Sequence, residues 1–154
     1  MMHAYDEQYL DDAMRNLGEA ADYAVNACNM TLQKFFDLFV ALMRLSYQRK
    51  IKEMKAWSEK IATMGREKQK HFLSYCQRMI RENFIYNFRN TSITYLDNEE
   101  EAFSTRFAPF INERNVIEIM NELNEAQRHI EHNVNAKMVF FDFSLKMIVL
   151  LIQK

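Results

Sequence analysis

The sequence predicts an all-α fold, a compact bundle of five to seven helices. The first observation behind this prediction is that 154 residues contain only two glycines and one proline. Antiparallel sandwiches and α/β folds need such residues at almost every connection. The second observation is that apolar residues recur at spacings of three and four along most of the chain, as one face of a helix requires. With 49% apolar residues, the chain can form one core.

The N-terminal part is predicted to be separate from the bundle. Residues 1–31 are expected to form an N-terminal helical extension, and residues 32–154 a single helical domain. Tyr9, Leu10, Met14 and Leu17 form a loose apolar stripe that we expect to end near Gly18. Thr31 is expected to cap a core helix over 32–45, because that segment is apolar around most of its circumference.

The middle of the chain predicts two more long helices. Residues 51–64 have one apolar stripe among charged positions, which is typical of a surface helix. Gly65 is expected to end this helix as a left-handed cap, and a third helix follows from Arg66 to near Phe88. Residues 90–98 are polar and predict a turn, after which Glu99, Glu100 and Glu101 suit the positive start of a short helix.

The last two helices are predicted over 113–132 and 136–153. Asn112 is expected to cap the first, and Asn133 or Asn135 the second. The second is so apolar that one neighbouring helix would not cover it. Two interpretations stay open: part of its surface meets another subunit or domain, or the core of its own chain covers it.

Charge is distributed unevenly along the chain. The net charge is −5 over residues 1–31, +8 over 32–89 and −4 over 90–154. The basic segment 49–81 could bind nucleic-acid phosphates as a free-standing helical module. Its basic residues alternate with Glu53, Glu59 and Glu67, however, and such spacing is also typical of ion pairs on a solvated helix face.

No motif for catalysis or for binding a cofactor or metal is visible. The two glycines are too far apart for a phosphate-binding loop. His129 and His132 lie one helical turn apart without the other ligands of a metal site. Cys28 and Cys76 lack metal or disulfide spacing, and Cys76 falls on an apolar stripe that predicts a buried thiol. With neither a secretory signal nor a membrane-spanning segment in sight, we expect a cytoplasmic protein without a membrane partner.

Three blocks of sequence together resemble a known family. They are Phe36-Asp-Leu-Phe-Val-Ala-Leu-Met-Arg-Leu-Ser-Tyr-Gln-Arg-Lys50, the segment from Met64-Gly-Arg-Glu-Lys to Arg81-Glu-Asn-Phe84, and Phe107-Ala-Pro-Phe-Ile-Asn-Glu-Arg-Asn115 leading to Asn133-Val-Asn-Ala-Lys-Met-Val-Phe-Phe-Asp-Phe-Ser-Leu-Lys-Met147. The blocks resemble the C-terminal helical domain of the delta-prime subunit of bacterial DNA polymerase III. The resemblance covers about residues 35–153, and the related gamma/tau subunit is the nearest alternative.

The resemblance implies a role in assembly. In that family, AAA+ modules precede helical domains that pack into a collar, and the collar holds together the loader that places a sliding clamp on primed DNA. This sequence shows no phosphate loop, no zinc cysteines and no Ser-Arg-Cys motif, so ATPase roles do not carry over. The implied function is a non-catalytic DNA-replication assembly domain whose partners are the delta and gamma/tau subunits, with DNA and the clamp reached only through the complex.

The resemblance and the apolar last helix together suggest candidate partner-binding residues. The contact helices are expected to be 136–153 and 113–132. Phe143 and Val149 are expected at outward apolar positions of the last helix. Four polar residues are expected at the rim of the interface: Arg114, Asn115, Asn135 and Lys137.

Overall fold

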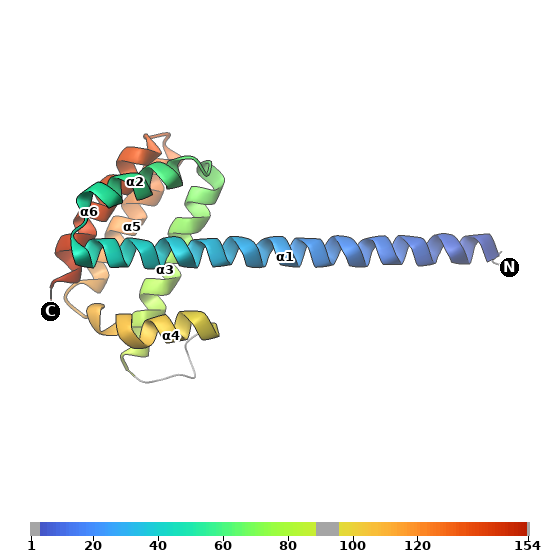
Figure 1. Ribbon diagram of the computed structural model, residues 1–154, viewed down its shortest axis with the longest axis horizontal. Coiled ribbons are helices and arrows are strands. Elements are labelled where there is room, and N and C mark those ends of the chain that lie inside the picture. The colour runs from blue at the N-terminus through green and yellow to red at the C-terminus, as the bar shows by residue number, and fades with distance from the viewer. Residues whose placement is uncertain (1–3, 89–95, 154) are drawn as a thin grey trace. The chain divides into compact units, whose positions relative to one another are not determined.

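The computed structural model describes residues 4–88 and 96–153, and within these ranges all regular structure is helical. The α-helices are α1 (Ala4–Gln48), α2 (Ile51–Ala62), α3 (Arg66–Tyr86), α4 (Asn98–Phe107), α5 (Val116–Glu131) and α6 (Ala136–Leu151), shown in Figure 1. A short 3₁₀ helix, η2, covers Ala108–Phe110. The all-α prediction is confirmed. Most of the turn predicted at 90–98 lies outside the described residues.

Helix α1 is longer than the sequence predicts. It runs without a break from Ala4 to Gln48, so the predicted end near Gly18 and the predicted cap at Thr31 are both wrong. A glycine inside a helix costs only about 1 kcal/mol relative to alanine, and the neighbouring alanines Ala20, Ala21 and Ala24 favour the helix. No proline interrupts the segment, so nothing forces the backbone to leave the helix there.

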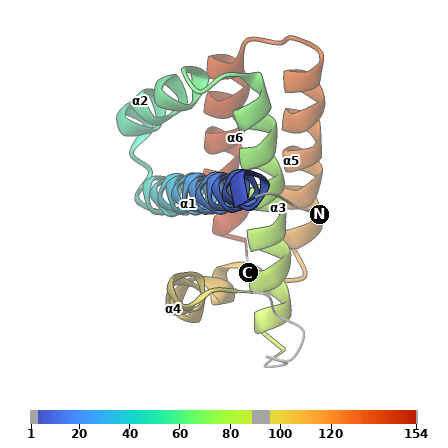
Figure 2. The ribbon, with the colours of Figure 1, turned by 90° about the vertical axis from the view of Figure 1, so that its right-hand side faces the viewer.

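The chain divides into two compact units, Met1–Asp37 and Leu38–Lys154. The second unit contains the end of α1 and all later helices. In it, α3, α5 and α6 lie side by side, and α2 packs against α6 (Figure 2). Each helix therefore buries an apolar face against at least one neighbour. The boundary falls six positions after the one that we predicted between residues 31 and 32.

The end of α1 lies in the core of the second unit. Phe39 and Leu42 are completely buried. The Phe39 ring meets Phe103 and Phe107 of α4 edge-on, with ring centroids 5.9 and 5.8 Å apart. The Trp57 indole of α2 donates a hydrogen bond of 3.1 Å to the Leu38 carbonyl oxygen. A prediction of core packing for this segment is thus confirmed, although the helix itself begins much earlier.

Two helices begin at side-chain caps. Asn135 accepts a hydrogen bond from the Met138 N–H and caps α6, as predicted. Asp97 accepts from the Glu100 N–H at 2.8 Å, while the Glu100 carboxylate accepts from the Asp97 N–H at 3.1 Å. This reciprocal capping box fixes the start of α4. The sequence carries its pattern, an acidic residue followed three positions later by a glutamate.

Positive φ angles mark three of the described connections, the first at Arg49 between α1 and α2, with φ +58°. Gly65 has φ +87°, a backbone conformation that side chains disfavour, but it precedes α3 and does not form the predicted left-handed cap of α2. Asn133 has φ +64° and follows the end of α5. The Val134 N–H donates to the His129 carbonyl oxygen at 3.0 Å, which satisfies a carbonyl of the last turn.

A pair of asparagines joins α5, η2 and the end of α6. Asn112 Oδ1 accepts from the N–H groups of Arg114 and Asn115, at 2.9 and 3.2 Å. The Asn115 side chain accepts from the Asn112 N–H and donates to the carbonyl oxygens of Phe110 and Leu150, at 2.9, 2.8 and 2.9 Å. Asn112 also donates to the Gln153 carbonyl oxygen at 2.7 Å. Helix α5 begins at Val116 with Asn115 as its N-cap residue, three positions after the predicted cap at Asn112.

We expect Asn115→Ala to lower the free energy of unfolding by about 2–3 kcal/mol, because the fully buried side chain makes three hydrogen bonds that alanine cannot replace. Urea unfolding followed by circular dichroism measures the change. Asn121→Ala, at an exposed position of α5, is the control and should shift stability by less than about 0.5 kcal/mol. Equal effects of the two substitutions would contradict the structural role of Asn115.

Among the helices that the structure describes, none is both long and apolar enough to cross a membrane.

Candidate assembly surface on the last helix

The composition of α6 determines how it packs. Twelve of its sixteen residues are apolar, and the four polar ones are Lys137, Asp142, Ser144 and Lys146. A helix that is apolar around its circumference is stable only where protein covers most of it. Helix α6 contacts two elements extensively, α2 and α5. We therefore expect α2 and α5 to bury only one side of α6 and to leave an exposed apolar strip on its other side.

The inner side of α6 completes the core. Its buried residues are Val139, Phe140, Phe143, Ser144, Met147, Leu150 and Leu151. The Phe140 ring lies 6.1 Å from the Trp57 ring of α2 and 6.2 Å from the Phe72 ring of α3, centroid to centroid. Aromatic contacts of this kind add to the free energy gained from burial alone. This side of α6 holds the second unit together and is not available to a partner.

The outer side of α6 is also apolar. Met138, Val149 and Ile152 are 68%, 56% and 53% exposed. Three more residues, Phe141, Leu145 and Ile148, are half-buried. The spacing of these positions, three and four residues apart, places them on one helical face. We call these six residues the α6 stripe.

Polar groups border the stripe on the α5 side. Lys146 Nζ lies 3.0 Å from the Asp142 carboxylate and 3.1 Å from the Glu122 carboxylate of α5. These hydrogen bonds, the one with Asp142 first and then the one with Glu122, raise the pKa of Lys146. An apolar strip next to a polar edge is the usual anatomy of a protein-binding surface.

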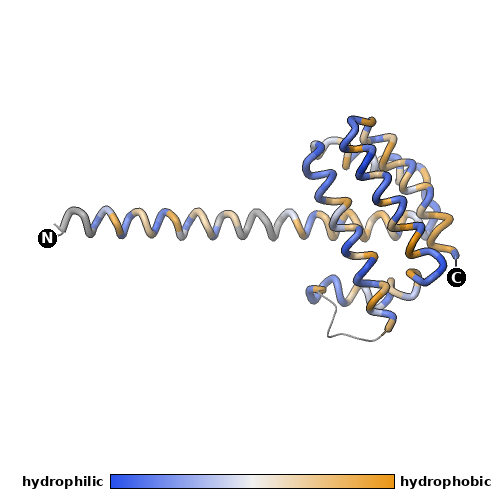
Figure 3. The backbone as a smooth tube through the Cα atoms, turned by 180° about the vertical axis from the view of Figure 1, so that it is seen from behind, coloured by the Kyte–Doolittle hydropathy of each residue, from blue (hydrophilic) through white to orange (hydrophobic). Residues whose placement is uncertain are grey.

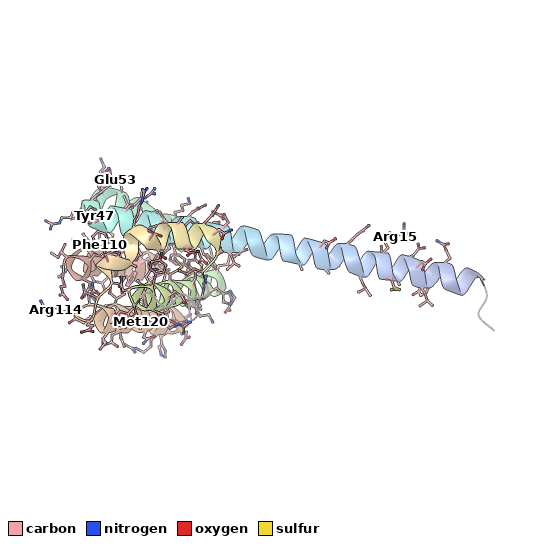
Figure 4. The ribbon with its side chains drawn as sticks, turned by 90° about the horizontal axis from the view of Figure 1, so that it is seen from below. Arg15, Tyr47, Glu53, Phe110, Arg114 and Met120 are labelled. Carbon is pink, nitrogen blue, oxygen red and sulfur yellow. The ribbon has the colours of Figure 1, made fainter. Side chains whose placement is uncertain are left out.

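Three of the predicted rim residues lie near the ends of α6. Lys137, in its first turn, pairs with Glu59 of α2 at 3.0 Å, and its hydrogen bond and charge lower the pKa of Glu59. Asn135 is exposed and caps the helix. Arg114 is exposed and lies within the turn in which Asn112 and Asn115 hold the C-terminal end of α6 (Figure 4). The stripe thus runs between Lys137 at one end and the neighbourhood of Arg114 at the other.

Two predicted contact residues are placed wrongly. Phe143 is only 3% exposed, so it belongs to the core and not to an outward surface. Asn115 is completely buried, and its hydrogen bonds are all made within the chain. Neither side chain can reach a partner without unfolding its surroundings. Of the two apolar residues that we singled out, only Val149 faces outward.

The contrast between Phe143 and Val149 is measurable. We expect Phe143→Ala to lower the free energy of unfolding by about 3–5 kcal/mol, the usual cost of removing a buried aromatic ring. Val149→Ala should cost less than about 1 kcal/mol because its side chain is already exposed. Parallel urea titrations compare them. Equal costs would show that Val149 is buried in solution.

A buried polar cluster between α3 and α4 was not predicted. The Glu100 carboxylate is 3% exposed and accepts hydrogen bonds of 2.7 Å from the Tyr75 hydroxyl and from the Arg78 guanidinium. The Arg78 guanidinium also lies over the Tyr75 ring, 5.2 Å from its centroid. Burial and the hydrogen bond to Glu100 raise the pKa of the Tyr75 hydroxyl. This cluster fixes α4 onto α3, and we assign no chemistry to it.

The predicted basic segment separates into paired and unpaired charges. Lys70 pairs with Glu67 at 3.0 Å, and Arg78 with Glu100 at 2.7 Å. Three lysines of α2, Lys52, Lys55 and Lys60, are exposed and form no ion pair within the described part of the chain. Within the described part of segment 49–81, the exposed basic residues without an ion pair therefore lie on α2, in the turn before it and at the start of α3, where they include Arg66 and Lys68.

The histidine pair and Cys76 also have definite surroundings. His129 Nε2 lies 3.9 Å from the Glu125 carboxylate, and His132 is exposed at the end of α5. Over residues 4–88 and 96–153, no group of three His, Cys, Asp or Glu side chains is placed to hold a metal ion. Cys76 is buried as predicted, and burial raises the pKa of its thiol. The Cys28 side chain lies outside the described residues.

Comparisons of the chain with protein-family models, with curated proteins and with solved structures find no match in any of the three.

Proposed function

We propose that this chain is a non-catalytic assembly domain that binds other protein subunits through the α6 stripe. The observation that carries the proposal is the exposure of Met138, Val149 and Ile152 on a helix whose opposite face completes the core. Leaving large apolar side chains in water is unfavourable, and a contiguous strip of them is typical of protein-binding surfaces.

The resemblance of residues 35–153 to a delta-prime collar domain supplies the specific form of the proposal. On that basis the partners are the helical domains of the delta and gamma/tau subunits of a DNA polymerase III clamp loader. The domain acts in the cytoplasm, needs no cofactor, and reaches DNA and the sliding clamp only through the assembled complex. The pattern of the last helix, a polar start at Asn135 followed by a long apolar run, is the part of the resemblance that coincides with the α6 stripe.

The polar residues at the ends of the stripe form the rim of the proposed interface. Arg114 and Lys137 carry exposed positive charges near its two ends. Charged groups at the rim of an interface contribute mainly to orientation and association rate, whereas the apolar centre contributes most of the affinity. The apolar residues of the stripe, Val149 among them, are therefore the expected centre of the contact, and Arg114, Lys137 and Asn135 are its rim.

We expect Val149→Asp to weaken binding to the delta and gamma/tau helical domains at least about tenfold, because a carboxylate would be buried without a partner. The helical circular dichroism signal should stay unchanged, since Val149 is 56% exposed. The control is Leu32→Asp, which changes a 46% exposed apolar residue of α1, outside both predicted contact helices, in the same way.

Binding is measured by isothermal titration calorimetry with each purified partner domain. Loss of binding in the Val149 variant alone supports the α6 stripe. No binding by the unaltered chain, or equal loss in both variants, would refute the proposed surface.

The alternative, a nucleic-acid-binding module using the basic segment 49–81, is supported by the exposed Lys52, Lys55 and Lys60 of α2. Binding through phosphates would give an affinity for single-stranded or primed DNA that falls steeply with salt. The logarithm of the affinity falls with the logarithm of the salt concentration, with a slope of about −1 for each phosphate contact. As an assembly domain, the isolated chain should bind DNA weakly at 150 mM salt. A fluorescence-anisotropy titration from 50 to 300 mM salt decides between the two, and a steep slope with tight binding would favour the alternative.

A further inference from the structure

The N-terminal half of α1 has a second apolar face, distinct from the α6 stripe. Leu10, Met14 and Leu17 are 49%, 70% and 71% exposed. Ala21 and Ala24 continue the same spacing of four and three residues and are also exposed. Alternating steps of four and three define the seam of a coiled coil. Figure 3 shows the corresponding alternation of hydrophobic and hydrophilic residues along this part of the helix.

The charged residues of this segment avoid the seam. Within 12–22, every charged side chain lies at a position on the opposite side of the helix: Asp12, Arg15, Glu19 and Asp22. Asp12 and Arg15 pair with each other, and Figure 4 labels Arg15 on this part of the helix. Three positions next to the seam hold the small residues Ala13, Gly18 and Ala20, and Asp11 flanks the seam at its N-terminal end. Over residues 12–22, a second helix can therefore approach closely without facing a charge.

We propose that residues 10–24 of α1 pair antiparallel with the same residues of a second copy of this chain, about a two-fold axis at position 19. In this register, Met14 lies opposite Ala24 of the second copy, and Leu17 lies opposite Ala21. Every described layer then combines one large and one small side chain, so the two helix axes stay at a constant separation. Gly18 of each copy then lies level with Ala20 of the other, so small residues flank the seam beside the axis.

The parallel arrangement fits the same residues poorly. It would stack Met14 and Leu17 on their counterparts at one end, and Ala21 and Ala24 on theirs at the other. One end would need a wide separation and the other a narrow one, which leaves voids or forces the helices apart. The large and small residues thus select an isologous antiparallel pair of identical chains.

Electrostatics favours the same choice. Residues 1–31 carry a net charge of −5. In the antiparallel register, Asp11 of one copy lies about 24 Å along the helix axis from Asp11 of the other, at 1.5 Å per residue, beyond the Debye length of about 8 Å at physiological salt. A parallel pair would place these acidic ends side by side. Antiparallel helix dipoles add a small favourable term.

The expected pair is weak. The paired segment is about 20 Å long and buries roughly 1,000 Å² in total, at the small end of specific interfaces. Little affinity is lost to ordering, because α1 is already a continuous helix to Gln48 in the single chain. We expect a dissociation constant of about 10–100 μM for the full chain.

Sedimentation equilibrium of the full chain between 5 and 500 μM tests the pairing. The unaltered chain should shift from monomer to dimer, and Leu17→Glu should raise the dissociation constant at least about tenfold. Asn16→Glu introduces the same charge on the adjacent, outward-facing residue and should change it less than about threefold. A chain that stays monomeric at 500 μM, or equal effects of the two variants, would overturn the proposal.

Disulfide crosslinking tests the orientation in a Cys28→Ser background, with the buried Cys76 left in place. Met14→Cys and Ala24→Cys should crosslink when the two variants are mixed and scarcely at all when each is alone. Stronger crosslinking of each variant to itself would show a parallel pair and overturn the antiparallel register.

This inference does not rest on the clamp-loader proposal, and the two can fail separately. Val149→Asp should leave self-association unchanged, and Leu17→Glu should leave binding to the delta and gamma/tau domains unchanged. If the chain stays monomeric and Leu17→Glu instead abolishes binding to those domains, the occupant of the α1 face is another protein and self-pairing is wrong.

Discussion

The limited interior of the second unit is the constraint on which the rest of the structure depends. Helix α6 is apolar around nearly its whole circumference, but its extensive contacts are with α2 and α5. Two neighbouring helices cover one side of a helix and leave the opposite side open. Burial of Phe140, Phe143 and Met147 therefore goes together with exposure of Met138, Val149 and Ile152. Stability and the surplus apolar surface have the same origin, which is why the α6 stripe is a feature of the fold and not of one residue.

The sequence predicts those parts of the fold that depend on residues close together along the chain. The existence and approximate bounds of α2, α3, α5 and α6 follow from apolar spacing, and the cap at Asn135 follows from residue type. The continuity of α1 does not follow in the same way. A glycine and a threonine inside a helix are tolerated at small cost, so they resemble end signals without ending the helix.

The candidate site shows a second limit of prediction. Because α6 has apolar residues on every side, its sequence predicts an unburied surplus but not which side carries it, and Phe143 and Val149 look equivalent. Their difference, 3% against 56% exposed, is set by how α6 is rotated against α2 and α5. Asn115 and Glu100 are similar cases. Both are polar residues that look exposed in sequence, and both are buried because their partners, Leu150 and Tyr75, lie far away along the chain.

The α6 stripe and the α1 face differ in where their charged residues lie, and this difference determines how salt affects association at each. The α6 stripe has large side chains and charged residues at its ends, Lys137 and Arg114, so the rate of partner binding there should depend on ionic strength. The α1 face has small residues beside most of its seam, and Asp12, Glu19 and Asp22 lie on the outer side. Salt would screen mainly the repulsion between the acidic segments and would leave the apolar contact intact. Raising salt should therefore change the association rate at α6 and slightly favour pairing at α1, a difference that reflects where the charges lie relative to each apolar contact.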